Sequence, residues 1–355
     1  MRIGILTSGG DCSGLNPVIR GFVKYVVREI PGAEIYGFRN GYLGLMTRDY
    51  VILQEKDVEN ILDQGGTILG SIRQPYKLMT VSENGEPTKL QIMVENYRKL
   101  KLDCLVTMGG AGTHKTASLL SVEGCNVIGL PKTIDNDIYG TDVTFGFHSA
   151  VEVATEAIGR IKTTAESHAR TFFVEVMGNK VGWLTLYSGI AGGADGVFIP
   201  EIPYNMDAVC EWVSKRKAEG HRSTLVAVAE GAMSTDEMAM DKKERRAYLE
   251  STDKTVSERL AATVSARCGV EARASVLGYI QRGGAPSAYD KLLSTEIGAC
   301  GGACVKNGQF GVSVCYRGGK LTCNALTDIA GRAKVVPPDH QFVRLARSMG
   351  IYFGD

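Results

Sequence analysis

Residues 130–137 read Leu-Pro-Lys-Thr-Ile-Asp-Asn-Asp. They continue the apolar run 126–130, which predicts a buried β-strand, so the polar residues are expected at the mouth of a sheet. Open α/β sheets bind ligands at that edge. Asp135 and Asp137 are two residues apart and would share one face of an extended segment, beside the hydroxyl of Thr133 and the ammonium of Lys132.

This group of side chains suits phosphoryl transfer. One carboxylate can take the proton of an attacking hydroxyl, the second can hold a metal ion or orient the substrate, and the cation can offset phosphate charge. An alternative is an Asx-rich turn whose side chains bind their own backbone. The residues alone leave both interpretations open, and the remaining motifs favour the first.

Two glycine-rich loops follow predicted strands. The strand Arg2–Thr7 runs into Ser8–Gly14 before a helical pattern that starts near Pro17. The strand Asp103–Met108 runs into Gly109–Thr113, and a helix continues from there. Glycines let a backbone approach phosphates closely, and the first N–H groups of a helix attract anions. The same glycines could serve turn geometry alone, but two such loops beside an acidic cluster predict a crevice along one sheet edge.

Several arginines lie near predicted turns. Arg73 follows the glycine-rich segment Gly65–Ile72 and could fork onto phosphate oxygens. Arg170, Arg273 and Arg282 are placed at loop positions beside later strands, which are predicted at 171–176, 197–199, 225–229 and 274–277. A single arginine of this kind is usually a solvated or ion-paired surface residue, so the alternative of an ordinary surface charge stays open for each.

Composition limits the class of protein. The chain has 355 residues, 44% of them hydrophobic and 22% charged, which suits a globular protein of about two domains. Lys plus Arg number 40 against 39 for Asp plus Glu, so no overall field recruits nucleic acid or a membrane surface. We find no leader sequence and no long apolar run, which predicts a cytoplasmic protein. The chain has nine cysteines, none of them in a C-x-x-C pair, and five dispersed histidines. This pattern does not predict a zinc site.

Taken together, the motifs resemble the 6-phosphofructokinase family from Arg2 to about Gly331. The resemblance implies an α/β protein with two Rossmann-like three-layer α/β domains and the active site in the cleft between them. It assigns 1–140 plus roughly 284–335 to the phosphoryl donor, and roughly 141–283 plus 336–355 to fructose 6-phosphate. It also implies a glycolytic kinase that transfers a phosphoryl group from ATP to O1 of fructose 6-phosphate, with Mg²⁺, in a homotetramer or homodimer with shared sugar-phosphate sites.

The resemblance also assigns roles to residues. Asp135 would be the base, with Thr133 and Arg73 as the other catalytic residues. The donor would contact the residues of the loops and the strand ends, namely Gly10, Arg73, Gln74, Gly110, Gly112, Thr113 and Lys132. The sugar phosphate would contact Thr133, Asp135, Asp137, Arg170, Met177, Gly178, Asn179, Glu230, Arg273, Tyr279 and Arg282, with Arg170 and Arg273 reaching the site of a neighbouring subunit.

Three positions depart from the family pattern. Ala111 stands where the family usually has a carboxylate associated with magnesium, so Asp137 becomes the candidate metal ligand. Tyr279 stands where bacterial members often have His. Glu55 replaces an arginine of the effector site, which argues against nucleotide or phosphoenolpyruvate control of the usual bacterial type.

The donor and the activity each have an alternative. Gly112 leaves room for an α-phosphate where pyrophosphate-dependent relatives carry Asp, which favours ATP, whereas Lys132 is shared with pyrophosphate users. Ala111 also motivates an alternative of another class, a weakly catalytic paralogue that binds sugar phosphate or nucleotide as a regulatory protein. The intact Asp135, Thr133 and Arg73 favour an enzyme.

Overall fold

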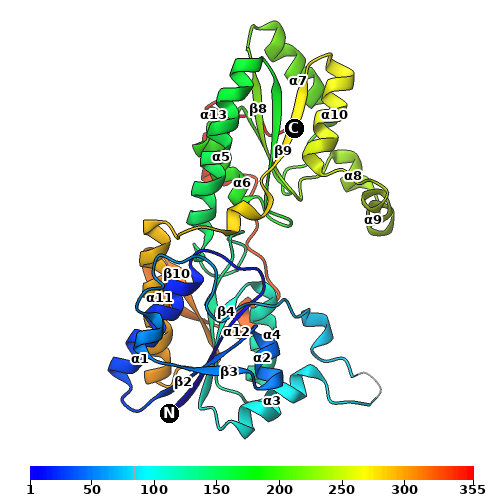
Figure 1. Ribbon diagram of the computed structural model, residues 1–355. Coiled ribbons are helices and arrows are strands. Elements are labelled where there is room, and N and C mark those ends of the chain that lie inside the picture. Colours follow the sequence, from blue (N-terminus) through cyan, green and yellow to red (C-terminus); the bar gives the residue numbers. More distant parts are fainter. Residues whose placement is uncertain (83–84) are drawn as a thin grey trace. The chain divides into compact units, whose positions relative to one another are not determined.

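The computed structural model describes residues 1–82 and 85–355. The chain divides into two compact units (Figure 1). Unit 1 comprises Met1–Ser149 and Arg282–Lys334, and unit 2 comprises Ala150–Gln281 and Val335–Asp355. Helix α5 (Phe147–His168) begins at the boundary and lies mostly in unit 2. The assignment of the donor to one unit and of the sugar phosphate to the other stays a prediction.

Unit 1 is built on a seven-stranded sheet in the order β11-β10-β5-β4-β1-β2-β3. The strands β10, β5, β4, β1 and β2 are parallel, and the edge strands β11 and β3 are antiparallel to their neighbours. The strand bounds are β1 Arg2–Ser8, β2 Glu34–Phe38, β3 Tyr50–Leu53, β4 Cys104–Gly109, β5 Val127–Pro131, β10 Val312–Arg317 and β11 Lys320–Ala325. The central strands β1, β4 and β5 are apolar and almost wholly buried because helices cover both faces of the sheet.

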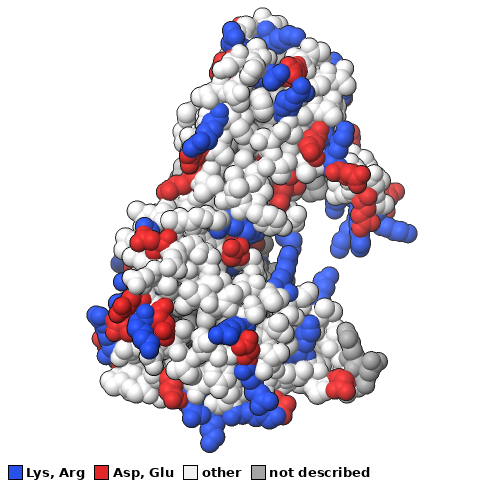
Figure 2. All heavy atoms as spheres, viewed as in Figure 1, with Lys and Arg blue, Asp and Glu red and all other residues white. Residues whose placement is uncertain are grey.

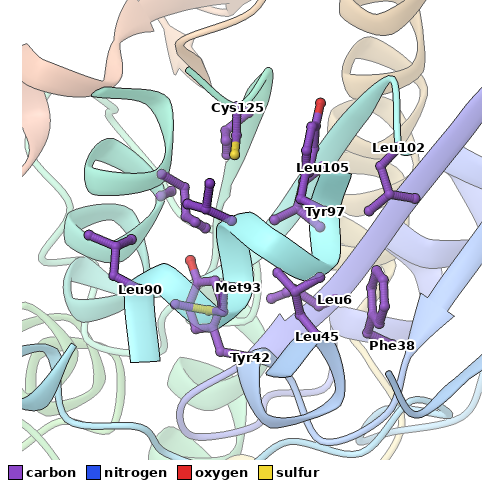
Figure 3. Packing of buried hydrophobic residues seen from close by; sticks show 14 of the residues in the cluster. Leu6, Phe38, Tyr42, Leu45, Leu90, Met93, Tyr97, Leu102, Leu105 and Cys125 are labelled. Atoms are coloured by element: carbon purple, nitrogen blue, oxygen red, sulfur yellow. The ribbon is translucent and has the colours of Figure 1, made fainter. Parts of the chain in front are cut away.

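Helices form the outer layers of unit 1. In Figure 1, α1 and α11 cover one face of the sheet, and α2, α3, α4 and α12 cover the other. Their bounds are α1 Leu15–Glu29, α2 Tyr42–Thr47, α3 Lys89–Lys99, α4 Ala111–Val122, α11 Ala288–Lys306 and α12 Leu326–Ile329, with 3₁₀ turns at Glu55–Val58 and Tyr76–Leu78. Figure 3 shows part of the core on the second face, where Leu6 and Phe38 of the sheet lie near Tyr42, Met93 and Tyr97.

Unit 2 has a smaller, fully parallel sheet in the order β7-β8-β6-β9. Its strands are β6 Thr171–Val176, β7 Gly196–Phe198, β8 Thr224–Ala229 and β9 Ala272–Val276. Helices α5, α6 and α13 lie on one face, and α7 and α10 on the other (Figure 1). The remaining bounds are α6 Trp183–Ala191, α7 Met206–Ala218, α8 Thr235–Ala239, α9 Lys242–Glu250, α10 Val256–Cys268 and α13 Gln341–Ser348, with a 3₁₀ turn at Gly278–Arg282.

The surface carries both signs of charge. Figure 2 shows Lys and Arg interspersed with Asp and Glu over the visible face of each unit, as the balanced composition predicts. No helix within 1–82 or 85–355 has the length and apolar character needed to cross a bilayer. The cytoplasmic location stays a prediction.

Candidate active site

Three loops of unit 1 leave the sheet at the same level. Ser8 of β1 pairs with Gly109 of β4, and Gly109 pairs with Pro131 of β5. The glycine loop after β1, the start of α4 and the acidic turn after β5 are therefore neighbours at the carboxyl edge. The chain leaves β1 toward β2 on one side, whereas β4 lies on the other, so the edge between β1 and β4 is a topological switch point, where such sheets bind ligands.

Two cations lie against the first glycine loop. The Lys132 ammonium donates to the carbonyl oxygen of Gly10, and Arg282 Nη1 donates to the carbonyl oxygen of Asp11 over 3.0 Å. A Cβ added to Gly10 would approach Arg282 Nη1 to 2.8 Å, so a larger residue there would displace the guanidinium group. Burial lowers the pKa of Lys132, and the nearby Arg282 lowers it further. The side chains of Lys132 and Arg282 thus place two cationic groups beside the glycine loop, which suits the binding of an oligophosphate.

The start of α4 forms the second part of this edge. The helix begins at Ala111 after Gly110, and no side chain caps it. The leading N–H groups of such a helix favour an anion. Gly112 is exposed, and a Cβ built on it would meet nothing within 4 Å, so the space beside it is open. Thr113 is buried, and its hydroxyl donates to the Ser8 carbonyl over 3.4 Å, so its side chain joins the two loops.

The buried side chain of His114 connects the start of α4 to strand β10 of the sheet. Its Nδ1 lies 3.0 Å from the Gly110 carbonyl oxygen, and its Nε2 lies 2.9 Å from the Ser313 hydroxyl of β10. Burial lowers its pKa to about 4, with the charge of Lys132 acting in the same direction. The ring is therefore neutral near pH 7 and fixes the loop against the sheet.

The acidic turn is not an extended segment. Asn136 has φ of 54°, in the left-handed region, so the prediction that Asp135 and Asp137 share one face of an extended strand is wrong. The Asn136 carboxamide holds the turn, because its Oδ1 accepts from Thr144 N over 3.1 Å and its Nδ2 donates to the Asp142 carbonyl over 3.3 Å. The turn uses the asparagine for its own backbone and keeps the two aspartates partly exposed at the edge.

Thr133 sits at the base of the same turn. Its hydroxyl accepts from Asp135 N over 3.1 Å, and its carbonyl accepts from the Thr144 hydroxyl over 2.7 Å. Lys334 N donates to the Asp137 carbonyl over 2.9 Å. The backbone on both sides of Asp135 is therefore fixed by hydrogen bonds, which orients a residue expected to act by position.

The segment that carries Arg73 also joins the donor loop. The Ser71 hydroxyl donates to the Gly9 carbonyl, and the Thr7 hydroxyl donates to the Gly70 carbonyl over 2.7 Å. Arg73 itself is exposed, while the Gln74 amide oxygen accepts from the Lys89 ammonium over 2.9 Å. The segment is bonded to the loop two residues before Arg73, and the predicted phosphate contact of Arg73 stays a prediction.

In unit 2, a second group of predicted residues shares one sheet edge. Val176 of β6 pairs with Ala229 of β8, so Met177, Gly178 and Glu230 leave the sheet together. The Gly178 carbonyl accepts from Gly231 N over 3.1 Å, which ties the two loops. The buried Gln281 links this edge to the turn after β9, because its Oε1 accepts from Met177 N over 3.1 Å and its Nε2 donates to the Gly278 carbonyl over 3.0 Å.

Arg170 and Arg273 lie at the opposite edge of that sheet. Arg273 is a residue of β9 that pairs with Phe172, so its placement in a loop is wrong; Arg170 directly precedes β6. Both bind Glu271, over 2.8 Å from Arg170 Nε and 2.5 Å from Arg273 Nη2. Arg170 precedes all six residues of β6 and lies about 20 Å from Met177, whereas Arg273, level with Phe172, lies about 17 Å from it. The structure thus splits the predicted sugar-phosphate residues of unit 2 between two edges.

The remaining predicted residues differ in exposure. Tyr279 is 84% exposed on the 3₁₀ turn, whereas Arg282 ends that turn and reaches the donor loop. Asn179 is exposed, and its carbonyl oxygen packs closely against Gly231. A Cβ added to Gly231 would lie 2.0 Å from that oxygen, so the two loops leave no room for a side chain there. Within the described residues, no group of three or more His, Cys, Asp or Glu is arranged to hold a metal ion. The carboxylates of Asp135 and Asp137 therefore fit only a cation held mainly by water and phosphate, as Mg²⁺ commonly is.

Two positioning residues were not predicted. His114 directly follows the loop Gly109–Thr113, and Gln281 directly precedes Arg282, but neither was assigned a role. Both side chains are buried, and a buried polar group needs hydrogen-bond partners, but burial at these positions is not evident from their neighbours in the sequence. Their partners come from segments distant in the sequence and are visible only in the fold.

Comparison with known proteins agrees with this geometry. A family profile described as Phosphofructokinase matches residues 2–304. An ATP-dependent 6-phosphofructokinase of Spirochaeta thermophila is 48% identical over 356 residues, covering 99% of this chain and 97% of the relative. The chain belongs to the phosphofructokinase family. The resemblance inferred from its motifs is therefore confirmed, as is the α/β fold class.

Phosphofructokinase relatives of both donor classes are similar to this chain. A pyrophosphate–fructose 6-phosphate 1-phosphotransferase of Amycolatopsis methanolica is 43% identical, over 96% of this chain and 97% of the relative. The crystal structure of Pichia pastoris phosphofructokinase in the T-state matches with a TM-score of 0.78 and 31% identity, covering 93% of this chain but 35% of that one. This chain spans about a third of the length of the Pichia chain.

Proposed function

We propose that this protein is a 6-phosphofructokinase that transfers a phosphoryl group from ATP to O1 of fructose 6-phosphate and forms fructose 1,6-bisphosphate. The proposal rests on one observation: the strands β1, β4 and β5 end next to one another. Their ends place the first glycine loop with its two cations, the uncapped start of α4 and the Asp135 turn side by side. Phosphoryl transfer needs a donor held by positive groups and an acceptor hydroxyl beside a base. The relatives named for this reaction support the assignment.

In the proposed mechanism, the chain mainly positions its two substrates. The donor phosphates lie against the N-terminus of α4, Gly10 and Lys132, and Arg73 contacts the transferred group, where it stabilises charge in the transition state. Asp135 accepts the proton of the O1 hydroxyl as that oxygen attacks the terminal phosphorus. An aspartate is a weak base, so its contribution depends on placement, which the bonds from Thr133 and Thr144 supply.

Mg²⁺ would be held by Asp137, donor phosphates and water. The ion supplies charge neutralisation on the transferred phosphoryl group when it is bound. Ala111 at the start of α4 contributes no ligand, so the proposed site relies on few protein groups.

The sugar phosphate is proposed to contact residues at both edges of the unit 2 sheet, but in different subunits. Met177, Gly178, Glu230 and Tyr279 would act within one chain. Arg170 and Arg273 lie about 15–25 Å away along β6 and would act on the sugar phosphate of a neighbouring copy. We therefore propose a homodimer or homotetramer with shared sites.

ATP is the proposed donor because the open space at Gly112 admits an α-phosphate. The alternative, pyrophosphate, is supported by Lys132, because pyrophosphate-dependent relatives share a lysine at this position. Purified protein should form fructose 1,6-bisphosphate with ATP and Mg²⁺ and at least tenfold more slowly with pyrophosphate. Turnover with pyrophosphate alone would contradict the donor but not the reaction.

Absence of turnover with both donors, combined with measurable binding of fructose 6-phosphate, would favour the regulatory alternative. The Gly112→Asp variant sharpens the test of the donor. Its carboxylate should repel the α-phosphate, which raises KM for ATP and leaves KM for fructose 6-phosphate little changed. The charge-neutral Gly112→Asn variant is the matched control for size.

A further inference from the structure

Three thiols meet beneath the edge strand of unit 1, away from the proposed active-site residues. Cys300 and Cys304 lie one turn apart on α11, and Cys323 lies on β11. The Cys304 and Cys323 sulfurs are 3.5 Å apart, and Cys300 lies close enough to influence the pKa of both. All three are free cysteines. Nothing in the proposed reaction uses them.

The three thiols differ in access and in charge. Cys304 is 3% exposed, whereas Cys300 and Cys323 are partly exposed. Cys323 lies on β11, which borders the sheet among the described strands, and its partial exposure lets a small solute reach it. Hydrogen bonds from Cys300 and then Cys304 lower the pKa of Cys323, while burial opposes them. Because Cys323 is partly exposed and Cys304 is buried, a peroxide reaches Cys323 first, and the Cys304 sulfur lies 3.5 Å away as its partner.

We propose that Cys323 and Cys304 form a peroxide-sensitive dithiol, in which oxidation joins β11 to α11 by a disulfide. The oxidant is a hydroperoxide such as hydrogen peroxide. This inference is independent of the proposed function, because none of these residues touches a proposed substrate group.

The chemistry proceeds in two steps. The Cys323 thiolate attacks one peroxide oxygen, the O–O bond breaks, and a sulfenic acid forms as hydroxide leaves and takes a proton to become water. The Cys304 thiol then loses its proton, its sulfur attacks the Cys323 sulfur, and the second hydroxide leaves as water. Two thiols lose two electrons in total, and one peroxide is reduced to two waters.

The same chain contains an internal control. In unit 2, the Cys268 thiol donates to the Cys210 carbonyl over 3.5 Å, so this is also a close pair of cysteines. Burial raises the pKa of Cys210 to about 11, so that thiol stays protonated. Burial likewise raises the pKa of the separate thiols Cys104 and Cys315. If thiolate character decides the reaction, these cysteines should stay reduced while Cys323 reacts.

The experiment uses the full chain, reduced and freed of reductant, with a few equivalents of hydrogen peroxide. Free thiols are then blocked, and the protein is cut with trypsin without reduction. Cleavage after Lys291, Lys306, Lys320 and Arg332 places Cys300 and Cys304 in peptide 292–306 and Cys323 in peptide 321–332. Mass spectrometry should find these two peptides linked and the Cys210 and Cys268 peptides blocked as free thiols.

Variants then identify the partner of Cys323. Cys300→Ser should still form the link. Cys304→Ser should form it at least tenfold more slowly and should accumulate a sulfenic acid that a dione probe captures. The disulfide should also raise the Tm of the oxidised protein by several degrees, because it constrains the unfolded chain.

Three results would overturn the proposal. The first is a link that persists in Cys304→Ser and is lost in Cys300→Ser, since Cys300 would then be the partner. The second is oxidation of Cys210 and Cys268 as fast as that of Cys323. The third is wild-type protein in which the two peptides remain unlinked although peroxide is consumed.

Discussion

The two units place their predicted functional residues differently, although both are parallel α/β sheets. In unit 1, the loops after β1, β4 and β5 leave the sheet side by side and bond to one another. In unit 2, Met177, Gly178 and Glu230 lie at the carboxyl edge, whereas Arg170 and Arg273 gather on Glu271 at the other edge. One chain can therefore assemble the proposed donor residues locally, but it does not bring all of the proposed sugar-phosphate residues of unit 2 to one edge.

The contrast teaches that strand direction decides which residues can cooperate within one chain. Residues that follow parallel strands meet at one edge, and residues that precede them meet at the other. The arginines at the strand starts of unit 2 therefore either contact the sugar phosphate of another copy of the chain or form only a structural ion pair with Glu271. Loss of unit 1 residues should impair chemistry, and loss of the unit 2 arginines should impair binding.

The largest expected effect is on Asp135. Asp135→Asn removes the proposed base and should lower kcat by about 10²–10⁴-fold with much smaller changes in KM for either substrate. Steady-state kinetics with fructose 6-phosphate and ATP measure this directly. Asp137→Asn is the comparator. If Asp137→Asn instead abolishes kcat while Asp135→Asn mainly raises KM for the sugar phosphate, the roles of the two aspartates are exchanged.

The second effect tests the distant edge of unit 2. Arg273→Ala should raise KM for fructose 6-phosphate by about 10–100-fold, the value of one or two charge-assisted hydrogen bonds, with kcat less affected. Arg267→Ala removes an exposed arginine that pairs with Asp207 in the same unit and serves as the control.

The Glu271→Gln variant tests whether Arg170 and Arg273 bind phosphate or serve only in the ion pair with Glu271. It removes the charge that both arginines now contact and leaves their guanidinium groups intact. If the arginines bind substrate, KM should stay the same or fall. A rise in KM equal to that of Arg273→Ala would show that only the ion pair matters.

The third effect concerns acid stability, which should differ between the units. Burial lowers the pKa of His114 from 6.5 to about 4, so between these values the unfolded chain binds a proton that the folded chain does not. Stability is therefore lost as pH falls through this range, by about 2 kcal/mol between pH 7 and pH 5. Burial also lowers the pKa of His148 in unit 1, which adds in the same direction.

The two tryptophans, Trp183 and Trp212, are both in unit 2 and give a separate readout. As the pH falls, the far-ultraviolet circular dichroism, which reports both units, should change at a higher pH than the tryptophan fluorescence, which reports unit 2. In the His114→Gln variant, the pH values of the two transition midpoints should lie closer together. Coincident midpoints in the wild type would show that the units unfold together and that unit 1 is not the weaker part.

The smallest expected effect is at Ala111. If the metal is held by Asp137, phosphates and water, Ala111→Asp should change kcat by less than about threefold at saturating Mg²⁺. Activity titrated with Mg²⁺ measures this, with Ala111→Asn as the uncharged control. An increase in kcat of more than tenfold would show that the metal site of the wild type is defective.

Sequence patterns predicted most of the fold but only part of the site geometry. Buried apolar runs such as 171–176 and 225–229 located strands to within a residue, because central parallel strands are apolar throughout. The turn at Asn136 was predicted as extended, since φ at one residue depends on partners such as Thr144, eight residues later. Arg273 was predicted in a loop because polar residues at a strand start carry little periodic signal.

The threefold passage of the chain between the units has a consequence for synthesis on the ribosome. Strand β5 pairs with β4 but lacks its second neighbour until β10 (Val312–Arg317) has emerged, and β7 gains its bridge to Tyr352 only near residue 352. The central strands of both sheets can pair early, but each sheet keeps an unpaired border while the last tenth or so of the chain is translated. Unpaired borders recruit other strands. Nascent chains stalled after α11 should therefore be far more prone to aggregate than the released protein, and a chaperone that shields strand borders would act at this late stage.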